Sequence, residues 1–126
     1  MSRNAQVTEA VDALVRRTQR FSAEAYYFTL EALSYTLQRM AKKGRKGHIS
    51  GGELLEGIRD FARTRYGFLG RTVFESWGLK SSADFGDLVF DLADAELLAK
   101  QESDKKTDFE GGFEFAEAFE GVFIHD

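Results

Sequence analysis

Four aspartates recur at helical spacing and are the side chains in this sequence best suited to chemistry: Asp84, Asp87, Asp91 and Asp94. Carboxylate oxygens are the ligands that Mg²⁺ and Ca²⁺ prefer. A metal site needs ligands that converge on one point, whereas a straight helix spreads its side chains along its length. We therefore interpret the aspartates as a solvated helix face and predict no metal ligands.

Imidazole chemistry is limited to His48 and His125, and the chain has no cysteine. Nucleophilic catalysis needs a nucleophile, a base and an orienting group, and no serine or cysteine motif accompanies either histidine. The sequence therefore predicts no catalytic residue, no cofactor and a protein that is not an enzyme. A pair of carboxylates brought together by the fold is the feature that would revive an enzymatic interpretation.

Gly51 and Gly52 stand at the start of an expected helix, close to the basic residues between Arg39 and Lys46. Helix N-termini with glycines can bind phosphate. The spacing matches neither a Walker loop nor a dinucleotide-binding fingerprint, and Glu53 places negative charge where an anion would sit. Ser50 and Glu53 instead have the spacing of a capping box, so we predict helix capping here.

The elements that position these residues begin with two helices. Apolar spacing predicts a helix over residues 6–20 and a longer one from Ser22 to about Lys43, packed antiparallel. Gly44 should end the second helix, and a basic loop follows over residues 44–49. We predict a helical hairpin over 1–43, followed by this loop.

The rest of the chain predicts a three-helix module. The capping box at Ser50 opens a helix that Gly67 ends, and shorter helices are expected over 69–77 and 81–98. Two short strands around the turn Ser103–Thr107 would complete a winged-helix-like form. We therefore predict a mainly α, single domain over residues 1–126, with the module and an aromatic, acidic tail over 50–126.

Charge divides the chain into a basic and an acidic part. Residues 1–80 carry fourteen Lys and Arg against eight Asp and Glu, which gives +6, and residues 81–126 carry three against thirteen, which gives −10. The two parts should attract each other, within one chain or between neighbouring copies. No signal peptide or membrane span is recognisable, so we expect a cytoplasmic protein with no membrane partner.

The C-terminal tail alternates phenylalanine with glutamate, and its rings include Phe113, Phe115 and Phe119. Such a tail can pack its rings on the domain, or it can be a disordered acidic segment with aromatic anchors for a partner. Burial of each phenylalanine contributes about 1.5 to 3 kcal/mol, which favours packing.

The strings SGGELLEGIRDFA, FESWG, DFGDLVFDL and DFEGGFEFAEAF resemble a small protein family of planctomycete and verrucomicrobial bacteria. The likeness spans Tyr26 to Phe123. Members of the family often have proline where Phe68 stands and glycine where Glu96 stands. The family has no assigned activity, so the resemblance implies no catalytic or binding residues.

The split charge favours a protein-interaction module, in which a basic loop steers an acidic surface of a partner or of a second copy. A homodimer is a plausible form of it. The expected partner-binding residues are Arg39, Lys42, Lys43, Arg45, Lys46, Phe113, Phe115 and Phe119. The alternative is a nucleic-acid-binding regulator that places the basic loop and Arg16, Arg17 and Arg20 on phosphates. The helix over 81–98 would present aspartates to the major groove of DNA, and their repulsion by the phosphates opposes insertion of this helix.

Overall fold

The structure is a computed structural model that describes residues 4–45, 47–98 and 105–120. The prediction of a mainly α fold is confirmed, and no residue in these ranges lies in a strand. In chain order the elements are α1 (Ala5–Thr18), α2 (Ala23–Lys42), α3 (Gly51–Tyr66), the 3-10 turn η1 (Gly67–Leu69), α4 (Gly70–Ser76), α5 (Ser82–Asp94), the 3-10 turn η2 (Lys106–Phe109) and α6 (Phe115–Phe119).

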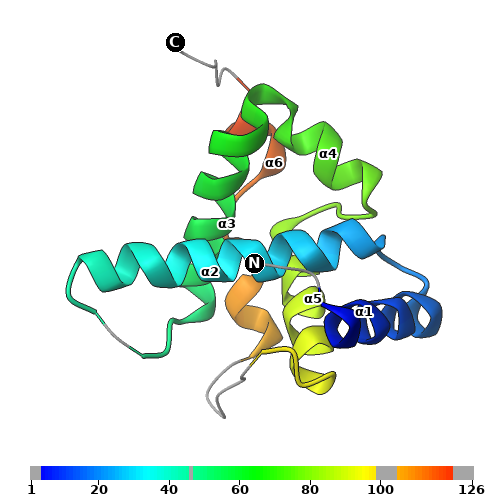
Figure 1. The fold of residues 1–126 in the computed structure, drawn as a ribbon. Helices are drawn as coiled ribbons and strands as arrows, with labels where there is room; N and C mark the ends of the chain where they lie inside the picture. Colours follow the sequence, from blue (N-terminus) through cyan, green and yellow to red (C-terminus); the bar gives the residue numbers. More distant parts are fainter. Residues whose placement is uncertain (1–3, 46, 99–104, 121–126) are drawn as a thin grey trace.

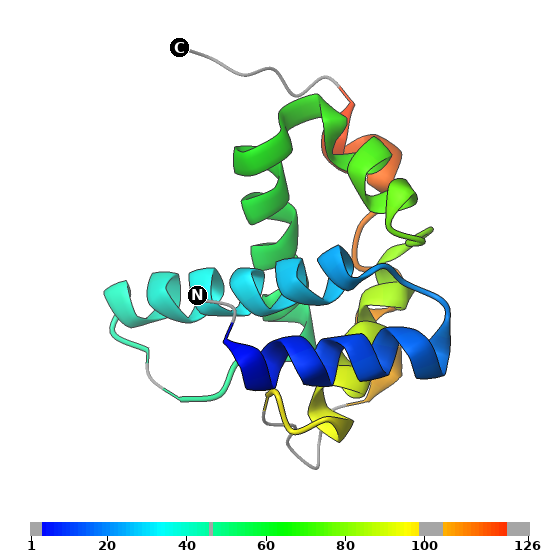
Figure 2. The same cartoon turned by 45° about the vertical axis from the view of Figure 1, so that its right-hand side comes forward.

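The long helix α2 is the centre of the fold and packs on α1, α3 and α5. Figure 1 shows α3 rising past α2 towards the corner where α4 begins, while α5 extends below α2. Figure 2 shows α1 and α2 running side by side in opposite directions, as the predicted helical hairpin requires. The short helix α6 lies beside α4 and η1. None of the helices in the described ranges has both the length and the apolarity of a bilayer span.

The helix ends follow the capping chemistry of the sequence. Ser50 and Glu53 form the predicted capping box: the Ser50 hydroxyl accepts from the Glu53 N–H at 3.1 Å, and the Glu53 carboxylate accepts from the Ser50 N–H at 2.9 Å. Gly44, with φ of 83°, follows the C-terminus of α2. Ser22 occupies the N-cap of α2 as expected, but its side chain makes no capping hydrogen bond.

An aromatic core joins the N-terminal helices to the tail. The ring of Phe74 in α4 lies 5.4 Å from Phe28 of α2, 5.0 Å from Phe85 of α5 and 5.4 Å from Phe119 of α6, all measured between centroids. Phe109, Phe115 and Phe119 are buried. The interpretation that the tail packs its rings is therefore confirmed as far as Glu120, while Phe123 lies outside the described residues.

The predicted β-hairpin and winged-helix form are not supported. Residues 99–104 lie outside the described ranges, and the part of the expected hairpin that follows them is the helical turn η2. The Asp108 carboxylate accepts from the Lys105 N–H at 3.1 Å, which closes this turn. Phe109 then points into the core against Gly51 and Gly86. One buried ring and one capping aspartate thus favour a 3-10 turn over a strand.

Candidate partner-binding site

The aspartates of α5 are used inside the fold. Arg20, at the joint between α1 and α2, donates through Nη1 to Asp87 at 2.6 Å and through Nη2 to Asp84 at 3.1 Å. The hydroxyl of Tyr26 donates to Asp91 at 2.9 Å, and Asp94 is exposed. Three of the four side chains therefore contact the N-terminal hairpin, which corrects the expectation of a solvated face. We call this contact the α5 seam.

The protonation of the α5 seam reflects its contacts. Burial alone would raise the pKa of Asp87, but the hydrogen bonds and charges of Arg20 and Lys106 outweigh it and hold this pKa below its ordinary value. Burial, reinforced by the neighbouring Asp91, raises the pKa of Tyr26 to about 12, although a hydrogen bond with Thr18 opposes the change. The seam is therefore charged on Asp87 and neutral on Tyr26 at physiological pH.

No metal site emerges from these acids. Across the described residues, no group of three or more histidine, aspartate or glutamate side chains converges as metal ligands must. The N-terminus of α3 is taken up by its own cap, because Ser50 and Glu53 bind each other's backbone N–H groups. Gly51 there packs against Asp108 and Phe109. Helix capping, the interpretation preferred over a phosphate site, is confirmed.

The predicted basic residues near the end of α2 fall into two kinds. Arg39 donates to Asp60 of α3 at 2.8 Å, and Arg45 forms an ion pair with Glu53. Lys42 and Lys43 are exposed and form no ion pair with any described residue. Lys46 lies outside the described residues. Of the predicted basic residues that the structure describes, Lys42 and Lys43 are thus the ones without an ion pair.

The predicted aromatic contacts are placed differently from the basic ones. Phe115 and Phe119 are 5% and 0% exposed, so they belong to the core and offer no surface to a partner. Phe113 is half-buried, with its ring 5.7 Å from that of Phe115. Phe115 and Phe119 are four residues apart along α6, so both side chains lie on the same, buried face of this helix. Two of the three predicted aromatic residues are therefore internal, and Phe113 remains half-buried.

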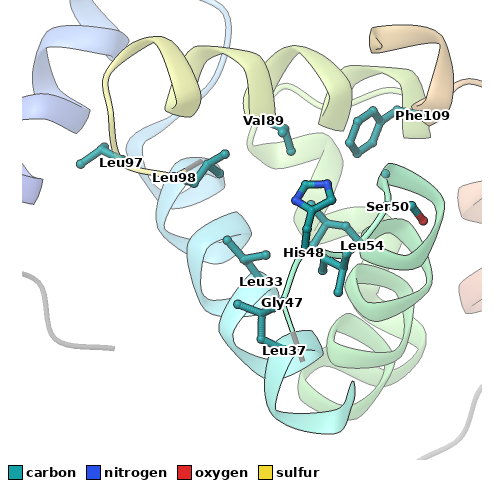
Figure 3. Close-up of a pocket in the computed structure, with 12 residues that line it drawn as sticks. Leu33, Leu37, Gly47, His48, Ser50, Leu54, Val89, Leu97, Leu98 and Phe109 are labelled. Atoms are coloured by element: carbon teal, nitrogen blue, oxygen red, sulfur yellow. The ribbon is translucent and has the colours of Figure 1, made fainter. Parts of the chain in front are cut away.

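An apolar groove lies along α2, and sequence reasoning did not identify it. Lys42 and Lys43 are not among its lining residues, and Lys43 lines a separate polar hollow with Glu53 and Asp60. Its main cavity has a volume of about 440 Å³, and a smaller hollow of about 220 Å³ adjoins it along Leu37 and His48. Figure 3 shows side chains from α2, α3, α5 and the loop before α3 turned towards this space. The main cavity is lined by Leu33, Leu37, Gly47, His48, Ile49, Ser50, Gly51, Leu54, Val89, Leu97, Leu98 and Phe109.

The lining of the groove is suited to binding rather than catalysis. Leucine, isoleucine, valine and phenylalanine form most of it, and His48 and Ser50 supply its side-chain polar groups. The Ser50 hydroxyl already caps α3 by accepting from Glu53 N–H. Concave apolar surfaces with few polar groups are typical of sites that bury an apolar ligand or side chain.

The signal for the groove was present in the sequence but ambiguous. Leu33 and Leu37 belong to the apolar stripe of α2, where spacing predicts burial. Leu37 is 39% exposed, because no described element covers α2 at that point. The residue before Leu37, Thr36, lies in close contact with α3, because an added Cβ at Gly57 would collide with it. Periodicity shows which face of a helix is apolar, but not how far along it the neighbouring helix extends.

Comparison with known proteins gives no function for the groove. No protein-family model, curated protein or solved structure matches the chain. The resemblance to the planctomycete and verrucomicrobial family stays a prediction.

Proposed function

We propose that this chain is a non-enzymatic protein-interaction module that binds an acidic, amphipathic segment of a partner chain in the groove. The observation that carries the proposal is an apolar cavity of about 440 Å³ on which Leu37 is 39% exposed. The helix that carries Leu37 ends with Lys42 and Lys43. Apolar side chains of the partner would fill the cavity, and its carboxylates would meet the two lysines. A cytoplasmic location remains the prediction of the sequence.

Apolar contacts supply most of the affinity in this proposal. A large apolar side chain gains about 1.5 to 3 kcal/mol when it is fully buried, so two or three anchors offset the loss of motion on binding. Leu37 is the most exposed hydrophobic residue of the groove, at 39%, and would be covered by the partner. Lys42 and Lys43 would mainly increase the rate of association, because exposed charges steer partners over distance.

The nucleic-acid alternative has less support. Among the cations expected to contact phosphates, Arg20, Arg39 and Arg45 are paired with carboxylates of the same chain. The aspartates of α5 lie against the N-terminal hairpin, so this helix has no face free to enter the major groove of DNA. Duplex DNA and single-stranded RNA therefore serve as competing ligands in the test.

The test is a titration with a fluorescent helical peptide that carries leucines at positions i, i+4 and i+7 and glutamates elsewhere. A peptide of the same composition in scrambled order is its control. We expect Leu37→Gln to weaken binding at least tenfold while the helical circular dichroism stays unchanged. Peptide binding that is unaffected by Leu37→Gln would contradict the proposal.

The charge arm of the test compares two double variants with the same change of net charge. Lys42→Glu with Lys43→Glu should slow association and reduce its dependence on salt. Arg16→Glu with Lys80→Glu changes exposed cations that do not belong to α2 and should leave association near the wild-type rate. Salt-sensitive binding of DNA or RNA that requires Lys42 and Lys43 but not Leu37 would favour the nucleic-acid alternative.

A further inference from the structure

We propose that the turn η2 controls the shape of the groove: docked against α3 and α5, it supplies the wall that Phe109 forms, and its release removes that wall. The inference rests on the proposed function, because it concerns the regulation of the same groove. Ligand binding in the groove and docking of η2 are then coupled in both directions, since thermodynamic linkage is reciprocal.

Phe109 belongs both to η2 and to the groove. It is the last residue of the turn and lines the main cavity, with 2% of its surface exposed. Figure 3 shows its ring and the Val89 side chain turned towards the same space. The other lining residues of the described ranges lie between Leu33 and Leu98. The wall at Phe109 is therefore the part of the groove that the C-terminal tail supplies.

Two glycines fix the position of the Phe109 ring. An added Cβ at Gly51 of α3 would lie 3.1 Å from Cε2 of Phe109, and one at Gly86 of α5 would lie 3.1 Å from Cβ of Phe109. Both distances are shorter than an ordinary van der Waals contact, so Phe109 fills the space that the missing side chains leave. We call Gly51 and Gly86 the socket. Because protein interiors are close-packed, Phe109 loses contacts if it shifts within the socket.

A buried hydroxyl ties η2 to α5. Ser82 Oγ donates to the Phe109 carbonyl at 2.7 Å and accepts from the Gly112 N–H at 3.1 Å. Ser82 is 2% exposed, so water does not readily replace its hydroxyl. At the surface, Lys106 Nζ lies 3.4 Å from Oδ1 of Asp87 in the α5 seam. These contacts hold η2 to α5 in addition to the socket.

The two helical turns of the tail, η2 and α6, are docked at opposite ends of α3. Phe109 packs against Gly51, the first residue of α3, whereas Phe119 of α6 packs against Gly70, which follows η1. Figure 1 shows η2, in orange, beside α5, and α6 beside α4. Turns of four and five residues are too short to be stable alone, so each depends on its own tertiary contacts. η2 can therefore open locally, at a lower free energy than global unfolding, while α6 stays in place.

Hydrogen exchange of the whole chain, measured by mass spectrometry without ligand, tests the local opening. Ser82→Ala removes the buried hydroxyl, and Gly86→Ala pushes Phe109 out of the socket by an independent route. We expect each variant to speed exchange at least tenfold over residues 105–112 and over residues 50–55, the start of α3 that Phe109 covers. Exchange over α6 should stay at the wild-type rate.

Thr29→Val is the matched control. Thr29 also has a buried hydroxyl that donates to a backbone carbonyl, that of Ala25 at 2.8 Å, but it is not among the described residues that line the groove. Its substitution should not speed exchange over residues 105–112 relative to α6. Faster exchange at 105–112 without a change at 50–55, equal acceleration of α6, or no acceleration in either variant would overturn the inference.

The acidic peptide of the proposed function measures the coupling. A ligand that binds only while η2 is docked reduces the open fraction by the factor 1 + [L]/Kd, which is about 100-fold at a peptide concentration of 100 Kd. We expect exchange over residues 105–112 of Ser82→Ala to slow by this factor. A peptide that binds through Leu37 and leaves this exchange unchanged would overturn the coupling and leave the interaction module standing. Absence of peptide binding would contradict the proposed function, and the exchange without ligand then decides the inference.

Discussion

Sequence patterns predict contacts both at the α5 seam and at the groove beside α2, but the two regions make different contacts in the fold. In the seam, Arg20 and Tyr26 bind Asp84, Asp87 and Asp91 of the same chain. At the groove, Leu37 is 39% exposed, and Lys42 and Lys43 at the end of the same helix form no ion pair with a described residue. Opposite charges in a sequence therefore predict a contact, but they do not indicate whether it forms within one chain or between two.

Burial also distinguishes the two regions. Tyr26 is 0% exposed and holds its hydrogen bond to Asp91 in the interior, whereas Leu37 on the same helix is 39% exposed. Leu37 follows Tyr26 by eleven positions, over which α2 passes from beneath its neighbours to an uncovered end. We therefore expect substitutions in the seam to change stability and substitutions in the groove to change binding.

The largest effect on stability should come from Gly78→Ala, which lies against the joint between α1 and α2. Gly78 has φ of 95°, and an added Cβ would collide with the backbone carbonyl oxygen of Arg20, which cannot move aside without shifting the joint between α1 and α2. We expect a loss of about 2 to 4 kcal/mol in unfolding free energy, measured by urea denaturation.

Gly44→Ala is the matched control, on the groove side. Gly44 has φ of 83° but no atom within 4 Å of an added Cβ, so only the backbone strain remains. The expected loss is about 1 kcal/mol. Equal losses at the two glycines would show that the contact with Arg20 does not contribute.

Tyr26→Phe should come next, with a loss of about 1 to 2 kcal/mol, because it removes a hydrogen bond to a carboxylate inside the fold. The pKa of Tyr26 is raised from 10.0 to about 12, so folding favours the neutral phenol. This contribution is fully present below pH 10.0 and is lost as the pH rises through about 12. Urea denaturation at several pH values should show the gap between wild type and variant narrowing over that interval.

Asp87→Asn tests the charged part of the seam and should cost about 0.5 to 1 kcal/mol at neutral pH, since Arg20 is half exposed and solvent screens the pair. The pKa of Asp87 lies below its ordinary value of 3.8. Its contribution is therefore present above pH 3.8 and is lost as the pH falls through the lowered pKa. Acid titrations of unfolding should show the variant and the wild type converging below that pH.

Asp94→Asn is the control for this pair. Asp94 lies on the same helix, is exposed and forms no ion pair with a described residue. Its substitution should leave the acid dependence of unfolding unchanged. A similar effect of Asp94→Asn and Asp87→Asn would indicate a general charge effect and not a specific contact.

The smallest effect on stability should come from the exposed C-terminus of α2. Lys42→Gln with Lys43→Gln removes two exposed charges without an ion pair and should change unfolding free energy by less than about 0.5 kcal/mol. Urea denaturation measures it beside the seam variants. A loss as large as that of Tyr26→Phe would show that the lysines serve the fold.

Local signals in the sequence predicted most of the helices. The stripe of α2, the capping box at Ser50 and the glycine at Gly67 set helix positions correctly because each acts within a few residues. The tail was harder, since Phe109 packs against Gly51 and Gly86, far away in the chain. A short segment fixed by such distant contacts has no period of its own to show whether it forms a strand or a turn.

The candidate site could be predicted only in part. The basic residues were identified, but the pairing of Arg39 with Asp60 and Arg45 with Glu53 depends on how α3 returns to α2. The groove joins residues from four separate segments, and no pattern within one segment reveals it.

The most direct test measures two properties of two variants on the same preparations: affinity for the acidic peptide and unfolding free energy in urea. We predict a crossed result, in which Leu37→Gln loses at least tenfold in affinity with little change in stability, and Tyr26→Phe loses about 1 to 2 kcal/mol with affinity unchanged. Affinity and stability that change together in both variants would contradict the division between seam and groove.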